Sequence, residues 1–248
     1  MPFIEHFVFC SGGNDSVALI QWIIEDARLD NVAVVYNDTG WAHPDWEERI
    51  SWIEGLCAAE GFHFYRTESK GMEKLCREKQ TFPMFGRQFC TQQLKIQPSV
   101  ELMDELDPER EACVMVGVRR EESRARSQFP EWTEDSVVHG GRLLWAPLVR
   151  HTEDMRNALV YNAGFEALPY RSRECFPCIF ANKQTVSEMD EQSIQKVRIL
   201  ENELGAAWFR PKDKMGAKNI DEAYAWSKRN NRKKGLTKEG CSSGYCGD

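Results

Sequence analysis

The stretch Phe7-Val8-Phe9-Cys10-Ser11-Gly12-Gly13-Asn14-Asp15-Ser16 decides the fold of this chain. Its first four residues form a continuous apolar run that ends at a turn signal, which predicts a short buried strand. Gly12 and Gly13 allow the backbone to approach a bound anion closely. From Ser16 onward the pattern predicts a helix, whose N-terminal N–H groups and dipole attract phosphate or sulfate. The stretch therefore predicts a phosphate-binding turn; it is not a Walker A motif, because no Gly-Lys-Ser/Thr follows.

The segments after this turn alternate between strand and helix patterns. This alternation predicts an α/β fold, with a Rossmann-like parallel sheet and helices on both of its faces. Ligands of such sheets bind at the carboxyl ends of the strands, so we expect Ser11–Ser16, Asn37–Gly40 and Gly117–Arg120 to form one site. The strand patterns cover residues 32–36, 62–65 and 113–116, and the helix patterns cover residues 43–60, 94–106, 152–162 and 187–204.

The length of 248 residues suits one large domain with a small extension. We expect a nucleotide-binding domain over 1–186, and over 187–248 an irregular helical, basic extension with a cysteine-containing tail. Neither a membrane-length apolar stretch nor a basic leader is present, which predicts a cytoplasmic protein without membrane contact. The net charge of −7 gives no overall sign of nucleic-acid binding. However, ten Lys and Arg against three acidic residues between Arg210 and Lys238 suggest contact with an anionic ligand or a nucleic acid.

The nine cysteines fall into two groups, and without an export signal they do not indicate a disulfide framework. Four of them lie in apolar or helical segments and are expected in the core. The other five stand beside turn residues, where thiolates suit an iron–sulfur cluster, a zinc ion or a redox dithiol. The core group is Cys10, Cys57, Cys76 and Cys113, and the turn group is Cys90, Cys175, Cys178, Cys241 and Cys246.

Six segments, in order, resemble the motifs of one family, the phosphoadenosine phosphosulfate (PAPS) reductase-like branch of the PP-loop superfamily, whose fold is adenine nucleotide alpha-hydrolase-like (HUP). The turn matches its SGGxDS signature. The other five segments are Tyr36-Asn37-Asp38-Thr39-Gly40-Trp41, Phe89-Cys90-Thr91-Gln92-Gln93-Leu94-Lys95-Ile96-Gln97-Pro98, Gly117-Val118-Arg119-Arg120-Glu121-Glu122-Ser123-Arg124-Ala125-Arg126, Ala146-Pro147-Leu148 with Thr152-Glu153-Asp154, and Cys175-Phe176-Pro177-Cys178.

The resemblance implies an adenine nucleotide, ATP above all, and Mg²⁺. It places the nucleotide on Ser11, Gly12, Gly13, Asn14, Asp15, Ser16, Asp38, Thr39, Lys95, Gly117, Arg119 and Arg126, with Asp38 near the Mg²⁺. It gives catalytic roles to Asp15, Arg119, Arg124 and Cys246. For iron–sulfur members of the family it implies a 4Fe-4S cluster on Cys90, Cys175 and Cys178, with Cys241 or Cys246 as fourth ligand; zinc is the alternative metal.

Two functions follow from this resemblance, and the basic segment adds a third. The first is ATP pyrophosphatase chemistry, in which a substrate is adenylated for iron–sulfur-dependent sulfur transfer or for nucleotide or nucleic-acid modification. The second is a sulfonucleotide (APS or PAPS) reductase, whose tail thiolate, Cys241 or Cys246, releases sulfite. The third is a non-catalytic nucleotide- or nucleic-acid-binding accessory protein. The partners to expect are an acceptor (a nucleic acid or a small molecule), a sulfur donor protein or thioredoxin-like reductant, and a second copy in a homodimer.

Overall fold

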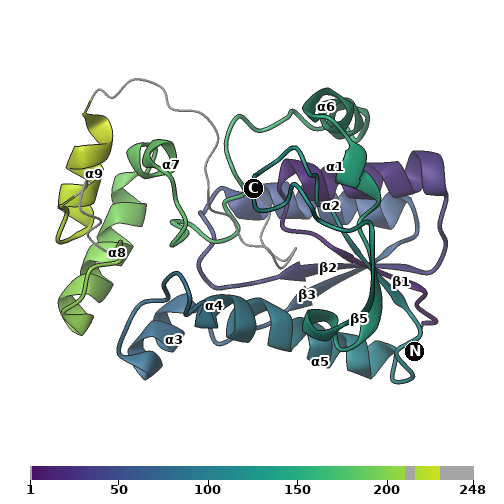
Figure 1. Cartoon of the computed structure of the whole chain (residues 1–248), viewed down its shortest axis with the longest axis horizontal. Coiled ribbons are helices and arrows are strands. Elements are labelled where there is room, and N and C mark those ends of the chain that lie inside the picture. Colours follow the sequence, from purple (N-terminus) through teal and green to yellow (C-terminus); the bar gives the residue numbers. More distant parts are fainter. Residues whose placement is uncertain (1, 210–215, 230–248) are drawn as a thin grey trace.

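The computed structural model describes residues 2–209 and 216–229, and its centre is one six-stranded sheet. The strand order is β3-β2-β1-β4-β6-β5, and every neighbouring pair is parallel except β5 with β6. Helices cover both faces (Figure 1). The strands are β1 (His6–Phe9), β2 (Val32–Asn37), β3 (His63–Thr67), β4 (Cys113–Val116), β5 (Trp132–Ser136) and β6 (Arg142–Trp145).

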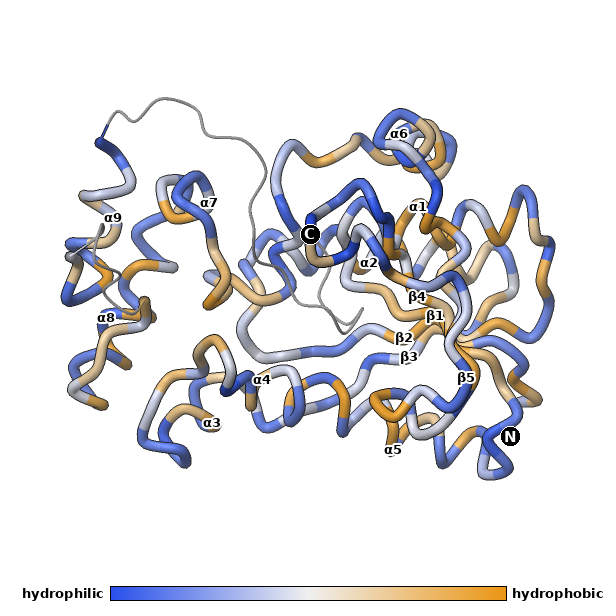
Figure 2. The backbone as a smooth tube through the Cα atoms, in the orientation of Figure 1, coloured by the Kyte–Doolittle hydropathy of each residue, from blue (hydrophilic) through white to orange (hydrophobic). Residues whose placement is uncertain are grey.

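The central strands are buried on both faces because their side chains alternate between two hydrophobic clusters. Val8 of β1 packs with α1, α2 and α6, whereas Phe7 and Phe9 pack with α5. Figure 2 shows β1, β2 and β4 as a mostly hydrophobic centre under more polar helices. The helices are α1 (Asn14–Trp22), α2 (Trp46–Ala59), α3 (Met72–Lys79), α4 (Phe89–Thr91), α5 (Gln97–Leu106), α6 (Glu153–Asn162), α7 (Lys183–Ser187), α8 (Glu191–Leu204) and α9 (Ile220–Lys228).

A third cluster joins α8 and α9 to the part of the chain that carries the sheet. Trp41, which follows β2, stacks on Trp208 with ring centroids 5.1 Å apart. Leu75 of α3 and Val197 of α8 are fully buried in the same cluster. Residues beyond 186 thus contribute to a core that they share with the preceding part of the chain. The domain boundary at residue 186 stays a prediction.

The expected α/β fold is confirmed, with several differences in detail. Helix α1 begins at Asn14, two residues before the expected start, and residues 183–187 form the separate helix α7 because Asp190 caps α8. The expected helix over 94–106 begins as a π-helical turn, η2 (Gln92–Ile96). Strand β5 was not expected. The remaining short segments are η1 (Ile23–Ala27), η3 (Val137–His139) and η4 (Pro147–Arg150).

None of the helices within the described residues is long and apolar enough to cross a membrane.

Candidate functional site

The strand order reverses between β1 and β4, which is where doubly wound sheets hold their ligands. The turn after β1 and the loop after β4 meet there. A Cβ atom on Gly117 would lie 2.4 Å from the carbonyl oxygen of Asp15, so only glycine permits this close approach. The sequence therefore brings two of its three expected loops into contact at the first turn of α1.

The turn itself is held from outside by α2. Gly12 has φ +72°, and a Cβ there would lie 2.7 Å from Cδ1 of Ile50. Trp46 Nε1 donates to the Ser11 carbonyl at 3.1 Å, and Arg49 Nε donates to the Gly12 carbonyl at 2.6 Å. These bonds fix the carbonyl groups of the turn. The N–H groups of the first turn of α1 have no acceptor inside the helix and are therefore available to an anionic ligand.

A cavity of about 190 Å³ lies beside that first turn. Arg119 Nε donates to Asp15 Oδ1, and Arg156 Nη1 of α6 lies 3.7 Å from the same oxygen. Both guanidinium groups are buried, and Glu122 lies on the same wall. The lining residues are Asn14, Asp15, Arg119, Glu122, Arg156, Leu168, Pro169, Tyr170, Arg171, Asn182, Gln184, Thr185 and Glu188.

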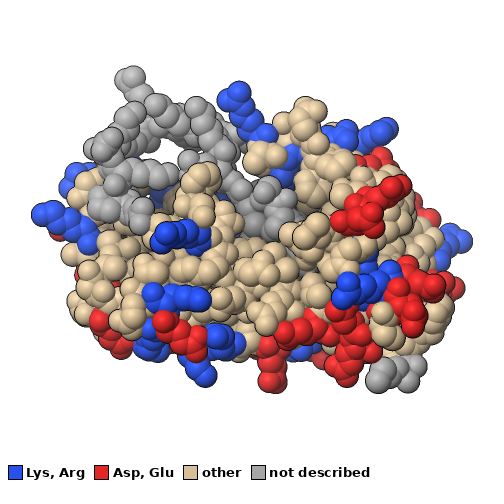
Figure 3. Space-filling model, turned by 60° about the horizontal axis from the view of Figure 1, so that its bottom comes forward, with Lys and Arg blue, Asp and Glu red and all other residues tan. Residues whose placement is uncertain are grey.

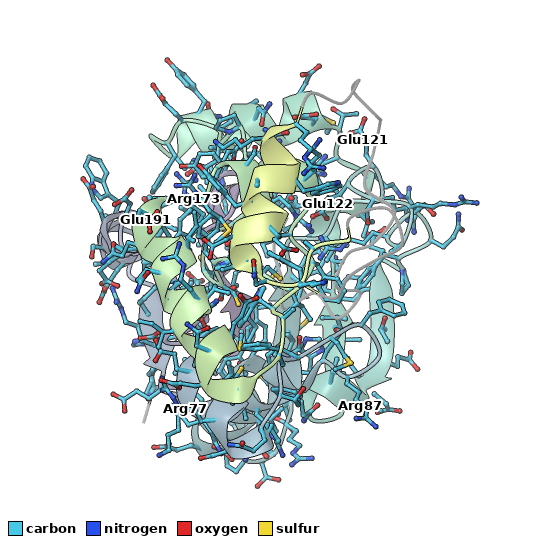
Figure 4. All side chains as sticks on the ribbon, turned by 90° about the vertical axis from the view of Figure 1, so that its left-hand side faces the viewer. Arg77, Arg87, Glu121, Glu122, Arg173 and Glu191 are labelled. Atoms are coloured by element: carbon cyan, nitrogen blue, oxygen red, sulfur yellow. The ribbon has the colours of Figure 1, made fainter. Side chains whose placement is uncertain are left out.

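Two carboxylates in this cavity each keep one oxygen without a partner among the described residues. Asp15 and Glu122 side chains are 3% and 4% exposed, and Asp15 Oδ2 and Glu122 Oε1 are the oxygens concerned. Burial, followed by the charge of Glu122, raises the pKa of Asp15, against the effect of Arg119. Figure 4 places Glu122 closer to the middle of the molecule than Glu121.

A second, largely apolar cavity of about 50 Å³ is lined by Cys90, Cys175 and Cys178. Buried Lys95, from the π-helical turn, forms an ion pair with buried Glu174 on its wall. π-Helical turns are frequent at functional sites. Residues 168–171 line the first cavity and residues between 172 and 180 line the second, so consecutive parts of one segment, which we call the shared wall, belong to the two sites.

The loop after β2 attaches this shared wall to the sheet. Thr39 Oγ1 donates to the Glu174 carbonyl at 2.9 Å, and the Phe176 N–H donates to the Trp41 carbonyl at 2.8 Å. The Ser172 hydroxyl donates to the Ser11 carbonyl at 3.0 Å. The turn that precedes α1 and the segment that carries Cys175 and Cys178 are thus directly linked.

Two of the thiols are hydrogen-bonded to each other. The bond from Cys175 lowers the pKa of Cys178 to about 7, and the same bond, together with burial, raises the pKa of Cys175. Burial raises the pKa of Cys90 to about 11. Across residues 2–209 and 216–229, however, no three His, Cys, Asp or Glu side chains are placed to hold a metal ion. The fourth expected ligand, Cys241 or Cys246, lies outside the described residues, as does most of the basic segment.

Several expected ligand residues are hydrogen-bonded to other protein groups or lie at the surface. Asp38 is exposed and accepts from the Gly40 N–H at 2.8 Å, and it lines neither cavity. Asn14 Nδ2 donates to the Leu168 carbonyl at 2.9 Å, which fixes the shared wall. Arg124 is exposed and lines neither cavity, whereas buried Arg126 forms an ion pair with Glu122. Ser16 Oγ donates to the Gly13 carbonyl at 2.9 Å, inside the turn.

The structure also shows residues that sequence reasoning missed. Arg156 comes from the helix predicted over 152–162, where it had no assigned role, and Glu174, next to Cys175, was not identified as a site residue. Glu122 lay inside a quoted motif without a role. Arg156 and Glu174 pair with residues far away in the sequence, at 141 residues for Arg156 with Asp15 and 79 for Glu174 with Lys95.

Residues 5–175 match the family model of the phosphoadenosine phosphosulfate reductase domain. Among curated proteins, an uncharacterized 37.8 kDa protein in the gpa 5′ region of Escherichia phage 186 is 25% identical over 240 residues, covering 74% of this chain and 70% of the phage protein.

Similar solved structures include three from other organisms. Phosphoadenylyl-sulfate reductase from Candida auris, in a phosphate complex, has a TM-score of 0.46 at 15% identity, covering 66% of this chain and 75% of its own. U34-tRNA thiolase NcsA from Methanococcus maripaludis, with its [4Fe-4S] cluster, has a TM-score of 0.47 at 14% identity, covering 92% of this chain and 82% of its own. NMN synthetase from Francisella tularensis has a TM-score of 0.47 at 14% identity, covering 95% of this chain and 90% of its own.

Proposed function

The chain belongs to the phosphoadenosine phosphosulfate reductase domain family of PP-loop proteins, and from this premise we propose that it is an ATP pyrophosphatase that adenylates an acceptor. The observation that carries the proposal is the composition of the larger cavity. It combines the first turn of α1, two buried arginines, and two carboxylates with an unpartnered oxygen each. A triphosphate with its magnesium ion matches this set of groups.

The phosphates would lie against the N–H groups of Asn14, Asp15 and Ser16, which have no acceptor inside the helix. Arg119 and Arg156 would neutralise the charge of the phosphates, because one guanidinium group can donate two parallel hydrogen bonds to phosphate oxygens. Both arginines are already held in place by Asp15. The site is thus organised before the ligand arrives, which is how positioning and electrostatics lower a barrier.

Asp15 and Glu122 fit a magnesium ion. Mg²⁺ is usually held by one or two carboxylates together with substrate phosphates, and the two unpartnered oxygens supply such ligands. When bound, the ion withdraws charge from the phosphate oxygens. Arg126 fixes the other side of Glu122 through their ion pair. This assignment replaces Asp38, which the structure places at the surface.

In the proposed reaction an oxygen of the acceptor forms a bond to the α-phosphorus of ATP. The bond from that phosphorus to the bridging oxygen of the β-phosphate breaks, and its electron pair leaves with pyrophosphate. The acceptor keeps AMP, so no oxidant or reductant is needed. The residues that stabilise the charge on the departing pyrophosphate are Arg119 and Arg156.

The thiols next to this site are proposed, as the sequence suggests, to bind an iron–sulfur cluster or zinc with a tail cysteine. We derive no reaction step through such a centre, since the described residues do not form a complete metal site.

The test is product analysis with ATP labelled at the α-phosphate and, separately, at the γ-phosphate. We expect AMP or an AMP adduct together with pyrophosphate, and exchange of pyrophosphate into ATP. Arg156→Gln should lower the rate about 100-fold, whereas Arg150→Gln, which removes an exposed arginine nearby, should not. Glu122→Gln should raise the Mg²⁺ concentration that is needed. ADP and phosphate as products would refute the proposal.

The description of the matching family favours one second candidate, a sulfonucleotide reductase. In that case the same cavity holds the sulfonucleotide, and a tail thiolate attacks its sulfur. Sulfite release from a sulfonucleotide with a dithiol reductant, together with no pyrophosphate from ATP, would establish the reductase. Nucleotide binding without any turnover would instead indicate the accessory protein.

A further inference from the structure

The turn that precedes Cys90 exposes an aromatic ring. Met84 and Arg87 pair through two backbone hydrogen bonds of 3.3 and 2.9 Å, so Phe85 and Gly86 form the tip of a tight turn. Phe85 is 78% exposed, although Phe82 on the same segment is buried. One exposed aromatic residue is ordinary on a protein surface, so its surroundings decide whether it has a role.

Its neighbour is a second aromatic residue at the thiol cavity. The rings of Phe85 and Phe180 are perpendicular, with centroids 6.5 Å apart. Phe180 lines the cavity together with Cys90 and Cys178. The two rings, which we call the stacking pair, therefore lie beside the thiols and at the end of the wall that both cavities share.

The segments around the stacking pair are basic in an acidic protein. Residues 79–100 contain three cations and no acidic residue, and residues 167–187 contain three cations and one acidic residue, Glu174, which is ion-paired with Lys95. In Figure 3 acidic side chains predominate over the right-hand part of the face, whereas basic and acidic side chains are interspersed at the left-hand end, which carries α3 and α8. Figure 4 shows Arg87 near the lower edge of that end. The cations are Lys79, Arg87, Lys95, Arg171, Arg173 and Lys183.

We propose that the stacking pair binds an unpaired base of a single-stranded nucleic acid, with Arg87 and the other exposed or partly exposed cations of these segments holding its phosphates; buried Lys95 is not one of them. Exposed aromatic rings next to cations are the usual means of binding single strands, because every base offers a flat face. A duplex offers no such face along its length. The assignment of the strand as the acceptor rests on the proposed adenylation. Its binding, however, is measured without ATP.

The test is fluorescence anisotropy of the full-length protein with labelled single strands of about 12 nucleotides, oligo(dT) and oligo(U), and a duplex of equal length. We expect Phe85→Ala to weaken single-strand binding about 5- to 100-fold and Phe85→Trp to preserve it. Tyr161→Ala is the matched control, since Tyr161 on α6 is also 78% exposed. Arg87→Ala should reduce the slope of log affinity against log salt by about 0.7.

Stacking also has a direct readout. A 2-aminopurine in the strand should be quenched by the native protein and less so by Phe85→Ala. Equal binding of duplex and single strands, or no effect of Phe85→Ala, would overturn the stacking pair. Failure to bind any strand while pyrophosphate is still released would refute the stacking pair alone, whereas binding without pyrophosphate release would refute the proposed reaction alone.

Discussion

Asp15 and Arg119 form a buried ion pair at the point where the strand order reverses. Their side chains are 3% and 6% exposed, and the two residues come from the first turn of α1 and from the loop after β4. A buried pair contributes little net stability, but the loss of one partner leaves an uncompensated charge. The pair therefore holds the two loops of the site in one arrangement.

The first prediction concerns this pair. Asp15→Asn should lower the free energy of unfolding by about 3–5 kcal/mol, because Arg119 and Arg156 would face each other without the anion between them. Arg119→Met should cost less, since Arg156 still faces Asp15. The double variant should recover about 1–3 kcal/mol relative to the sum of the two. Urea unfolding of the three variants measures these values.

The control is Arg124→Met, which removes an exposed arginine from the same segment and should change stability by less than about 0.5 kcal/mol. Additive losses in the double variant would contradict the coupling of the two residues.

The central sheet was predictable because buried parallel strands are continuous apolar runs, such as residues 32–36 and 113–116. Strand β5 escaped notice because its sequence, Trp132-Thr133-Glu134-Asp135-Ser136, lies at the sheet edge and is largely exposed. Helix α7 was not predicted, and the helix predicted over 187–204 begins only at Glu191, because the two short-spaced caps Asn182 and Asp190 start separate helices. Edge strands and short helices show little periodicity in the hydrophobicity of their sequence.

The site was predictable to the extent that it lies within local motifs. The turn before α1 and the loop after Gly117 were placed together by the rule for parallel sheets. Arg156 and Glu174 could not be predicted as site residues from the sequence. The packing of α6 on α1 places Arg156 at the site, and the ion pair with Lys95 holds Glu174 there. Asp38 had the right position in the sequence, but its carboxylate accepts from its own turn, at the N–H of Gly40.

The second prediction concerns Gly12, which has φ +72° and whose Cβ position is occupied by Ile50 and Trp46. Gly61 has φ +74° but open space around it, so it isolates the backbone effect. Gly61→Ala should cost about 1 kcal/mol of unfolding free energy. Gly12→Ala should cost a further 1–3 kcal/mol, approximately the penalty for overpacking. Thermal or urea unfolding compares them, and equal losses would show that α2 does not press on the turn.

The third prediction is a pH dependence. Burial lowers the pKa of His139 to about 4, from an ordinary value of 6.5. Between these pH values the unfolded chain binds more protons than the folded chain, so stability falls as the pH is lowered from about 6.5 to about 4. The loss is at most about 3 kcal/mol. His139→Asn should flatten this part of the curve, and His63→Asn, at an exposed position, should not. An unchanged slope in His139→Asn would refute the assignment.

The fourth prediction concerns the thiols at the second cavity. Protein purified without oxygen should contain iron and acid-labile sulfide and absorb visible light broadly, as iron–sulfur proteins do. Cys90→Ser, Cys175→Ser and Cys178→Ser should each lose the absorption, because the three thiols line one cavity. Cys57→Ser should keep it, since Cys57 lies on the buried face of α2, in a different cluster from these thiols.

The same samples distinguish the alternatives for these cysteines. Colourless protein with stoichiometric zinc would establish a zinc site, for which thiolates at short spacing are equally suitable. Metal-free protein would leave Cys175 and Cys178, whose thiols are already hydrogen-bonded, as a redox pair. In that case both should lose reactivity toward alkylating reagents together on mild oxidation, while Cys90→Ser changes nothing. Only the first result would place an iron–sulfur cluster beside the proposed nucleotide site.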